Sequence, residues 1–222
     1  ESRNGILLIN LTAGGISPDI IKGKDLYVHS IAIAPDNNTF YTAGTSNHIE
    51  KCNITSRSSD VIIQTDSRIN SLALSPDGQT LVAGTRGGKV ISWNTSGNYV
   101  ANVIFDDASN AVQSVNFSPN GRYLACGTQG GKILLFRTGT FELVRELSGH
   151  TARVTEIDFN ANSQFMASSA YDGTVRLWDM SNFSASPVTF NDNGGFVFSL
   201  GFSKAGNYVV SGSAQENRLV VR

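Results

Sequence analysis

The residues best suited to acid–base chemistry or metal binding in this chain are its three histidines, His29, His48 and His150. An imidazole takes part in catalysis when a nucleophile, a carboxylate or a metal ion shares its pocket. The chain contains none of the patterns HExxH, GxSxG or GxxxxGK followed by Ser or Thr, which place such groups together. We expect His29 at the start of a strand and His48 in a turn. The sequence therefore predicts that the protein is not an enzyme and has no catalytic residue, metal site or cofactor.

The two cysteines, Cys52 and Cys126, lie in strand-like segments in different parts of the chain. They do not form a metal-ligand spacing, and small buried hydrophobic side chains are the favoured interpretation over a disulfide.

Two glycine-rich stretches, GTRGGK at 84–89 and GTQGGK at 127–132, resemble loops that cradle phosphate. Phosphate loops of that kind lead into a helix whose N-terminus binds the anion. Here no helical pattern follows, and both stretches fall at the same place in a repeated unit. A hairpin turn with a glycine at positive φ is the favoured interpretation.

The repeated unit appears when the chain is compared with itself. Five similar segments begin at Ser30, Ser71, Ser114, Thr155 and Ser199, so their spacings are 41, 43, 41 and 44 residues. A near-constant period of about 40–45 residues is typical of a repeat architecture. The first stretch of the chain, NGILLINL, matches a later part of the unit, so the chain starts inside a further, partial repeat.

Each unit reads as four short strands separated by turns such as Pro76-Asp77-Gly78 and Pro119-Asn120-Gly121. In these turns proline sets φ in advance and glycine accepts a positive φ. A four-stranded sheet cannot bury both of its faces alone, but sheets stacked around an axis cover one another. The sequence predicts an all-β fold, a β-propeller of four-stranded antiparallel blades.

The fourth unit contains Gly149-His150 before its first strand and DGTVRLWD at 172–179. With these motifs the chain resembles the WD-repeat β-propeller family over essentially its whole length. In that family a His, a Ser or Thr, an Asp and a Trp form a buried hydrogen-bonded network. The resemblance implies a structural network of His150, Ser168, Asp172 and Trp178. Other units carry glycine at the Asp position, and one carries phenylalanine at the Trp position, so we expect the complete network once.

The resemblance also implies how the chain is divided. We expect one domain over 1–222, with a partial blade at 1–26 and repeats at about 27–66, 67–109, 110–150, 151–194 and 195–222. These ranges amount to about five to six blades. Because WD-repeat rings usually have seven blades, part of a seven-bladed ring is favoured over a complete ring of five or six.

Loops at one end of a propeller form a shared surface that commonly binds proteins or peptides in this family. Alignment of the units brings to that face the residue before each first strand and the turn between the second and third strands. Ser46 is aligned at this turn in the first unit. The candidate partner-binding residues are Tyr27, Arg68, Arg86, Gln129, Arg153, Tyr171 and Phe196. Arginine and aromatic residues dominate interface hot spots, and arginine matches the geometry of carboxylates and phosphates.

The formal net charge is −1, so no global basic field favours nucleic acid. No apolar run approaches the roughly 20 residues of a membrane span, and no signal peptide is recognisable, so we expect a cytoplasmic protein.

The favoured function is a non-catalytic scaffold that binds a protein or peptide segment carrying acidic or phosphorylated groups. The alternative is a sensor or regulatory domain of a larger signalling protein, such as an ATPase or kinase. An enzyme that uses the central channel is the third hypothesis. The sequence does not predict the oligomeric state.

Overall fold

The computed structural model describes residues 6–10, 17–25, 27–191, 195–213 and 219–221. In these residues the chain forms strands arranged in six antiparallel sheets, and no helix. Four sheets have four strands each, one has three and one has two. The predicted all-β fold of four-stranded blades is therefore confirmed.

The strands follow one another around the molecule in chain order. The first sheet contains β1 (Ile6–Asn10) and β2 (Ser17–Ile21). The second contains β3 (Val28–Ile33), β4 (Thr39–Gly44), β5 (His48–Asn53) and β6 (Ser58–Gln64). The third contains β7 (Ile69–Leu74), β8 (Thr80–Thr85), β9 (Lys89–Asn94) and β10 (Asn102–Asp106). The fourth contains β11 (Val112–Phe117), β12 (Tyr123–Thr128), β13 (Ile133–Arg137) and β14 (Leu143–Leu147). The fifth contains β15 (Val154–Phe159), β16 (Phe165–Ala170), β17 (Val175–Asp179) and β18 (Val188–Phe190). The sixth contains β19 (Val197–Phe202), β20 (Val209–Ser213) and β21 (Leu219–Val221).

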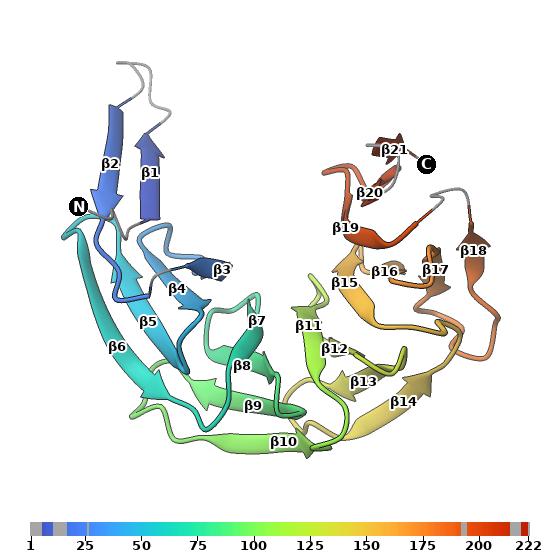
Figure 1. Cartoon of the computed structure of the whole chain (residues 1–222), viewed down its shortest axis with the longest axis horizontal. Coiled ribbons are helices and arrows are strands. Elements are labelled where there is room, and N and C mark those ends of the chain that lie inside the picture. Colours follow the sequence, from blue (N-terminus) through green and yellow to red (C-terminus); the bar gives the residue numbers. More distant parts are fainter. Residues whose placement is uncertain (1–5, 11–16, 26, 192–194, 214–218, 222) are drawn as a thin grey trace.

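The sheets stand side by side in an open arc (Figure 1). The first strands β3, β7, β11, β15 and β19 line the inside of the arc, and β6, β10, β14 and β18 lie along its outside. The arc is open between the β1–β2 sheet and the β19–β21 sheet. The boundaries of the single domain and its repeats stay a prediction, as does membership of a seven-bladed ring.

The glycine-rich stretches form hairpin turns, as the sequence predicts. Gly88 and Gly131 have φ of 83° and 84°, and strands β9 and β13 follow them instead of a helix. A Cβ atom on Gly88 would lie 1.8 Å from the carbonyl oxygen of Asp107, so no other residue fits there. The two stretches therefore form the turns that join β8 to β9 and β12 to β13, and they do not form phosphate loops.

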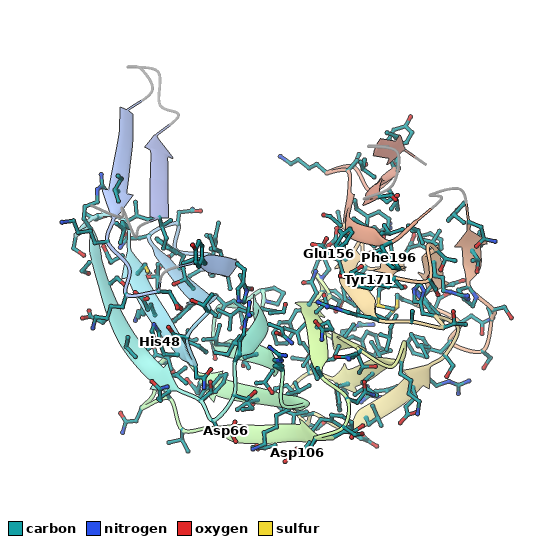
Figure 2. All side chains as sticks on the ribbon, in the orientation of Figure 1. His48, Asp66, Asp106, Glu156, Tyr171 and Phe196 are labelled. Atoms are coloured by element: carbon teal, nitrogen blue, oxygen red, sulfur yellow. The ribbon has the colours of Figure 1, made fainter. Side chains whose placement is uncertain are left out.

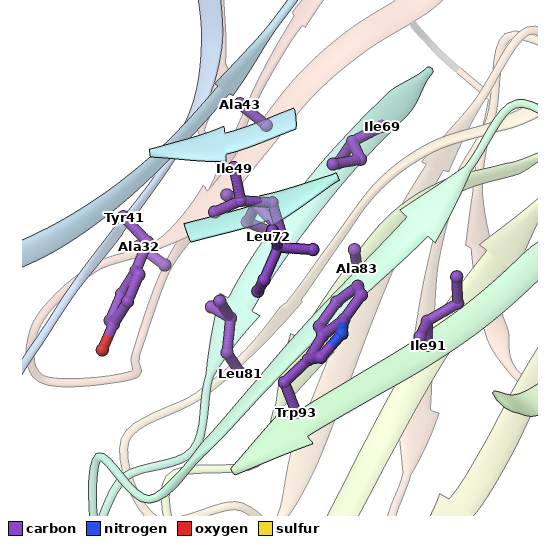
Figure 3. Packing of buried hydrophobic residues seen from close by; sticks show 11 residues of the cluster. Ala32, Tyr41, Ala43, Ile49, Ile69, Leu72, Leu81, Ala83, Ile91 and Trp93 are labelled. Carbon is purple, nitrogen blue, oxygen red and sulfur yellow. The ribbon is translucent and has the colours of Figure 1, made fainter. Parts of the chain in front are cut away.

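The core consists of apolar layers between neighbouring sheets. In one layer, Trp93 and Leu81 of the third sheet pack with Tyr41 and Ile49 of the second sheet (Figure 3). Each such layer buries one face of each of two sheets, which explains why the blades are stable only as a stack. Cys52 and Cys126 are both buried and free, so the prediction of no disulfide is confirmed.

Candidate interaction face

The predicted network residues meet at one end of the fifth sheet. Nδ1 of His150 lies 2.9 Å from a carboxylate oxygen of Asp172, and Nε2 lies 2.8 Å from the hydroxyl of Ser168. The indole N–H of Trp178 donates to the same hydroxyl at 2.9 Å. These bonds join the loop before β15, strand β16, the following turn and strand β17. The four side chains thus connect two strands, the turn between them and the loop that leads into β15.

Burial and hydrogen bonding set the charges in this network. Burial lowers the pKa of His150, Arg176 lowers it further, and the attraction of Asp172 opposes both effects. Burial alone would raise the pKa of Asp172, but hydrogen bonds from Thr174 and the Thr151 amide, with the His150 charge, hold that pKa below its ordinary value. The network therefore favours an ionised Asp172 beside a neutral imidazole.

The fourth sheet replaces this network with a shorter connection. Gly130 stands at the Asp position, and its amide donates to the side-chain oxygen of Asn110 at 2.8 Å. The side chain of Asn110 thus binds the turn from the loop before β11. Because the acceptor is neutral, this blade holds its turn without a buried charge.

The second sheet has a different arrangement of ionisable groups. Nε2 of His48 lies 3.2 Å from Oε1 of Glu50 and 3.6 Å from Oδ2 of Asp25. His48 begins strand β5, so the prediction that it lies in a turn was wrong. The ligand atoms of these three residues lie within 4.8 Å of one another, close enough for a metal ion. Oε1 of Glu50 already accepts from the amides of Lys24 and Asp25, so the protein itself provides partners for the buried carboxylate.

Two groups of candidate binding residues were aligned, those before the first strands and those in the turns between the second and third strands. Backbone hydrogen bonds show that both groups lie at the same end of the sheets. The amide of Arg86 donates to the carbonyl of Arg68 at 2.8 Å, and the amide of Tyr171 donates to the carbonyl of Arg153 at 2.9 Å. The amide of Gln129 donates to Ala111 in the same way. We call the end of the sheets that carries these loops and turns the loop face.

In the second sheet, the residue that lies opposite Tyr27 differs from the one that alignment placed there. The amide of Thr45, not that of Ser46, donates to the carbonyl of Tyr27. Strand pairing explains the difference. Ala43 occupies the same register position as Gly84, so the residues Ala-Gly-Thr at 43–45 are shifted by one position relative to the residues Ala-Gly-Thr at 83–85. Ser46 therefore lies one position further into the turn.

Three of the candidate binding residues form a stack. The guanidinium carbon of Arg153 lies 5.1 Å from the ring centroid of Tyr171. The Tyr171 ring stacks on Phe196 with centroids 4.6 Å apart and an angle of 23° between the planes. Figure 2 shows Tyr171 and Phe196 next to each other beside β15 and β19. An open hollow of about 310 Å³ lies beside this pair, between the turn after β16 and the loop before β19.

Phe198 extends the stack and was not among the predicted residues. Its ring contacts Tyr171 edge-on, with centroids 5.3 Å apart. The sequence held a usable signal, because Phe198 follows Phe196 by two residues where the chain enters β19, and residues two apart in an extended chain share a face.

The remaining candidates do not join the stack. Arg68 and Arg86 meet two sheets away from Arg153, Gln129 is exposed on the fourth sheet, and Tyr27 is exposed on the second sheet. Among the described residues, Tyr27 has no ring contact. The loop face thus carries one organised aromatic–arginine cluster and several separate side chains.

The inside of the arc encloses a cavity of about 530 Å³ lined by the first strands. His29 and Glu156 are the ionisable residues in its lining. His29 lies 2.9 Å from the carbonyl of Gly44, and Glu156 accepts the amide of Leu200 at 2.9 Å. Both side chains therefore connect strands, and the described lining does not bring two acidic groups together for catalysis.

The stacked antiparallel sheets, the repeat period and the His–Ser–Asp–Trp network together define a WD-repeat β-propeller. Residues 28–192 match the family model described as the second β-propeller of echinoderm microtubule-associated protein. The chain belongs to this family of β-propellers.

Known proteins share parts of the sequence and the fold. The chain is 31% identical over 67 residues to the human F-box-like/WD repeat-containing protein TBL1X, which is 30% of this chain and 11% of that protein. It is 42% identical over 41 residues to the U3 small nucleolar RNA-associated protein 21 homolog of Schizosaccharomyces pombe, which is 18% of this chain and 4% of that protein. The chain therefore spans about a tenth or less of the length of these relatives.

The fold is also that of the Cps50 (Swd1) β-propeller domain of Myceliophteria thermophila, with a TM-score of 0.80 at 14% identity over 93% of this chain and 72% of that one. TBL1X is a WD repeat-containing protein and the Cps50 match is a β-propeller domain, and similarity to WD-repeat propellers suggests a protein-interaction scaffold. The described part of the chain contains no helix that is long and apolar enough to cross a membrane.

Proposed function

We propose that this propeller is a non-catalytic scaffold whose loop face binds a peptide segment of a partner protein, centred on Arg153, Tyr171 and Phe196. The observation that carries the proposal is the stack of these three side chains at 5.1 and 4.6 Å. Aromatic and arginine side chains that are fixed before binding lose little entropy on contact, so they make efficient anchors.

The charge of Arg153 favours a partner segment with a carboxylate or phosphate group. Stacking on Tyr171 holds the guanidinium plane, and a fixed guanidinium offers paired N–H donors to a planar or tetrahedral anion. Arg68 and Arg86 add positive charge on the same face. A longer segment that crosses from the fifth sheet to the third would meet both sites.

The test is binding to an array of acidic and phosphorylated peptides, compared with the same peptides carrying Gln or unmodified Ser. We expect Arg153→Glu to lose binding of the acidic and phosphorylated peptides. The matched control is Arg122→Glu combined with Arg137→Glu, because these exposed arginines lie at the opposite end of the fourth sheet, where the Thr138 amide meets the Arg122 carbonyl. Equal binding by wild type and Arg153→Glu contradicts the proposal.

A sensor or regulatory domain of a larger signalling protein, and a cytoplasmic location, stay predictions from the sequence.

A further inference from the structure

At the end of the sheets opposite the loop face, a turn joins the first two strands of each unit. The turn of the third sheet packs against that of the second sheet, because a Cβ atom on Gly78 would lie 2.9 Å from the ring of Pro35. The turn of the fifth sheet contacts that of the fourth sheet, because the hydroxyl of Ser163 accepts the amide of Asn120 at 3.0 Å. In these two pairs of neighbouring sheets the adjacent turns are therefore in contact.

Between the third and fourth sheets a cavity separates the turns. Apart from its own chain neighbours, nothing among the described residues lies within 4 Å of a Cβ atom on Gly121, which is the glycine of the fourth sheet's turn. The same is true of Gly139, in the turn that follows β13. The cavity has a volume of about 450 Å³, and its apolar walls are Pro76 of the third sheet and Pro119 and Phe141 of the fourth sheet.

The lining of this cavity contains a hydroxyl group without a partner. The Oγ1 atom of Thr138 is buried, and no described residue forms a hydrogen bond with it. Thr95 holds the corresponding position in the third sheet, where its hydroxyl donates to the carbonyl of Gly78 at 2.7 Å. Buried polar groups in proteins are nearly always hydrogen-bonded. The Thr138 hydroxyl is therefore available to a ligand in the cavity, as a donor or as an acceptor.

A carboxylate stands at the rim of the cavity. Asp77 is exposed and is the one ionisable side chain among the described lining residues. Its Oδ1 accepts the hydroxyl of Ser75 at 2.5 Å and the amide of Gln79 at 3.0 Å. These two bonds lower the pKa of Asp77, so the carboxylate is ionised at neutral pH. In the described part of the chain no Lys, Arg or His forms an ion pair with it, so a ligand that carries a positive charge beside an apolar group complements the site.

We propose that this cavity binds a peptide segment of a partner protein in which a large apolar residue stands next to Lys or Arg. The apolar side chain fills the space between Pro76, Pro119 and Phe141. The cation pairs with Asp77, and the peptide main chain bonds the hydroxyl of Thr138. The volume lies in the range of about 300–1,000 Å³ that is typical of ligand pockets. Both prolines are exposed, so the cavity is open at its rim and a peptide chain can continue beyond it, which favours a peptide over a small molecule.

The site is separate from the stack on which the proposed function rests. The cavity lies between the third and fourth sheets at the end opposite the loop face, whereas the stack joins the fifth and sixth sheets at the loop face. Failure of one proposal therefore leaves the other intact.

The test begins with short peptides of defined sequence, titrated into nitrogen-labelled protein and followed by NMR. The probe is acetyl-Gly-Phe-Arg-Gly-amide. One control peptide carries Glu in place of Arg, and the other carries Ala in place of Phe. We expect the probe to bind in the millimolar range and to shift the amide signals of Gly121, Thr138 and Gly139. Each control peptide should bind at least about fivefold more weakly, because it lacks the cation or the apolar anchor.

Asp77→Asn tests the charge without disturbing the turn. Asn120 holds the corresponding position in the fourth sheet and makes the same two bonds, to the hydroxyl of Ser118 and the amide of Arg122. Asp77→Asn should therefore fold normally and weaken binding of the probe by about threefold. Asp36→Asn is the matched control, because it removes the same charge from the corresponding turn of the second sheet, outside the cavity lining. It should leave binding unchanged.

Three results would overturn the proposal. The first is the absence of shifts at Gly121, Thr138 and Gly139 with the probe at millimolar concentration. The second is equal binding of the probe and either control peptide, or equal binding by wild type and Asp77→Asn. The third is a shift of the same amides with protein concentration alone, which would assign the cavity to a second copy of this chain.

Discussion

The Tyr171 ring lies between two chemically different neighbours, the Arg153 guanidinium 5.1 Å from its centroid and the Phe196 ring stacked at 4.6 Å. The arrangement joins the turn after β16 to the loops before β15 and β19, so it holds two blades together at the loop face. Tyr171 itself is held by the backbone bond from its amide to Arg153. The stack is therefore a fixed surface before any partner arrives.

The first prediction concerns Arg153. Arg153→Glu should leave the melting temperature nearly unchanged, because Arg153 is partly exposed and surface changes of this kind usually alter stability by less than about 0.5 kcal/mol. It should weaken binding of an acidic or phosphorylated peptide by about tenfold or more, since it removes a fixed cation and adds a repelling charge. Isothermal titration calorimetry of wild type and variant measures the effect. Unchanged affinity at an unchanged melting temperature would remove Arg153 from the binding site.

The second prediction concerns Trp178, which is buried and donates to Ser168. Trp178→Ala should lower the free energy of unfolding by about 3–5 kcal/mol, because it leaves a large cavity and removes one of the two hydrogen bonds of the Ser168 hydroxyl. Trp178→Phe keeps most of the apolar contact and removes the donor, so about 1–2 kcal/mol is expected. Urea unfolding of the three proteins separates the two contributions. A loss for Trp178→Ala no larger than that of Trp178→Phe would show that packing of the indole contributes little.

The repeat made most of the fold predictable from the sequence. In the turn between the first and second strands, Gly78 and Gly121 have the positive φ values of 74° and 68° that the turn patterns imply. In the first and fourth units Asn37 and Ser163 adopt a positive φ at the same place. The strands that the repeat predicts appear in the same order and grouping in the structure. Repetition provides this information because each unit must bury its faces against similar neighbours.

The site was less predictable, because side-chain partners depend on register. The shared letters AGT suggested that Gly44 matches Gly84, but Gly44 occupies the position of Thr85, where a Cβ atom would lie 2.0 Å from the carbonyl oxygen of Tyr27. A shift of one residue moves each side chain to the other face of the strand. The same shift made the alignment place Ser46, instead of Thr45, opposite Tyr27.

The Asp25, His48 and Glu50 cluster escaped the sequence analysis for a related reason. His48 and Glu50 come from one strand, at positions where the other units carry different residue types, and Asp25 comes from the loop before β3. The repeat therefore gave no expectation for them. Only the paired strands bring these three groups within reach of one another.

The third prediction uses two glycines at the same register position on β12 and β20, Gly127 and Gly212. A Cβ atom on Gly127 would meet Val154 at 2.6 Å, whereas nothing lies within 4 Å of one on Gly212 among the described residues. Gly127→Ala should therefore cost about 1–3 kcal/mol through overpacking. Gly212→Ala should be neutral or slightly stabilising, because alanine reduces the entropy of the unfolded chain.

Thermal unfolding of the two alanine variants tests this contrast directly. Neither glycine has a positive φ, so backbone strain does not differ between them. Equal losses at the two positions would show that the β20 face is covered as closely as the β12 face. A loss at Gly127 alone would agree with close packing of each described blade against the next.

The fourth prediction is that acid destabilises the protein through the buried network. Burial lowers the pKa of His150 below 6.5, so between that value and the folded pKa the unfolded chain binds a proton that the folded chain does not. Stability is therefore complete above about pH 6.5 and is lost as the pH falls toward the folded pKa. Asp172, whose pKa also lies below its ordinary value of 3.8, adds a second loss in the same direction below that pH.

Urea unfolding at a series of pH values between about 7.5 and 5 measures the slope of this loss. His150→Gln should be less stable than wild type at neutral pH, because Asp172 loses its imidazole partner, but its stability should fall less on acidification. Burial and Arg68 also lower the pKa of His29, so His29→Gln should reduce the slope as well, and the double variant should reduce it further. If the double variant keeps the wild-type slope, neither imidazole is responsible for the acid sensitivity.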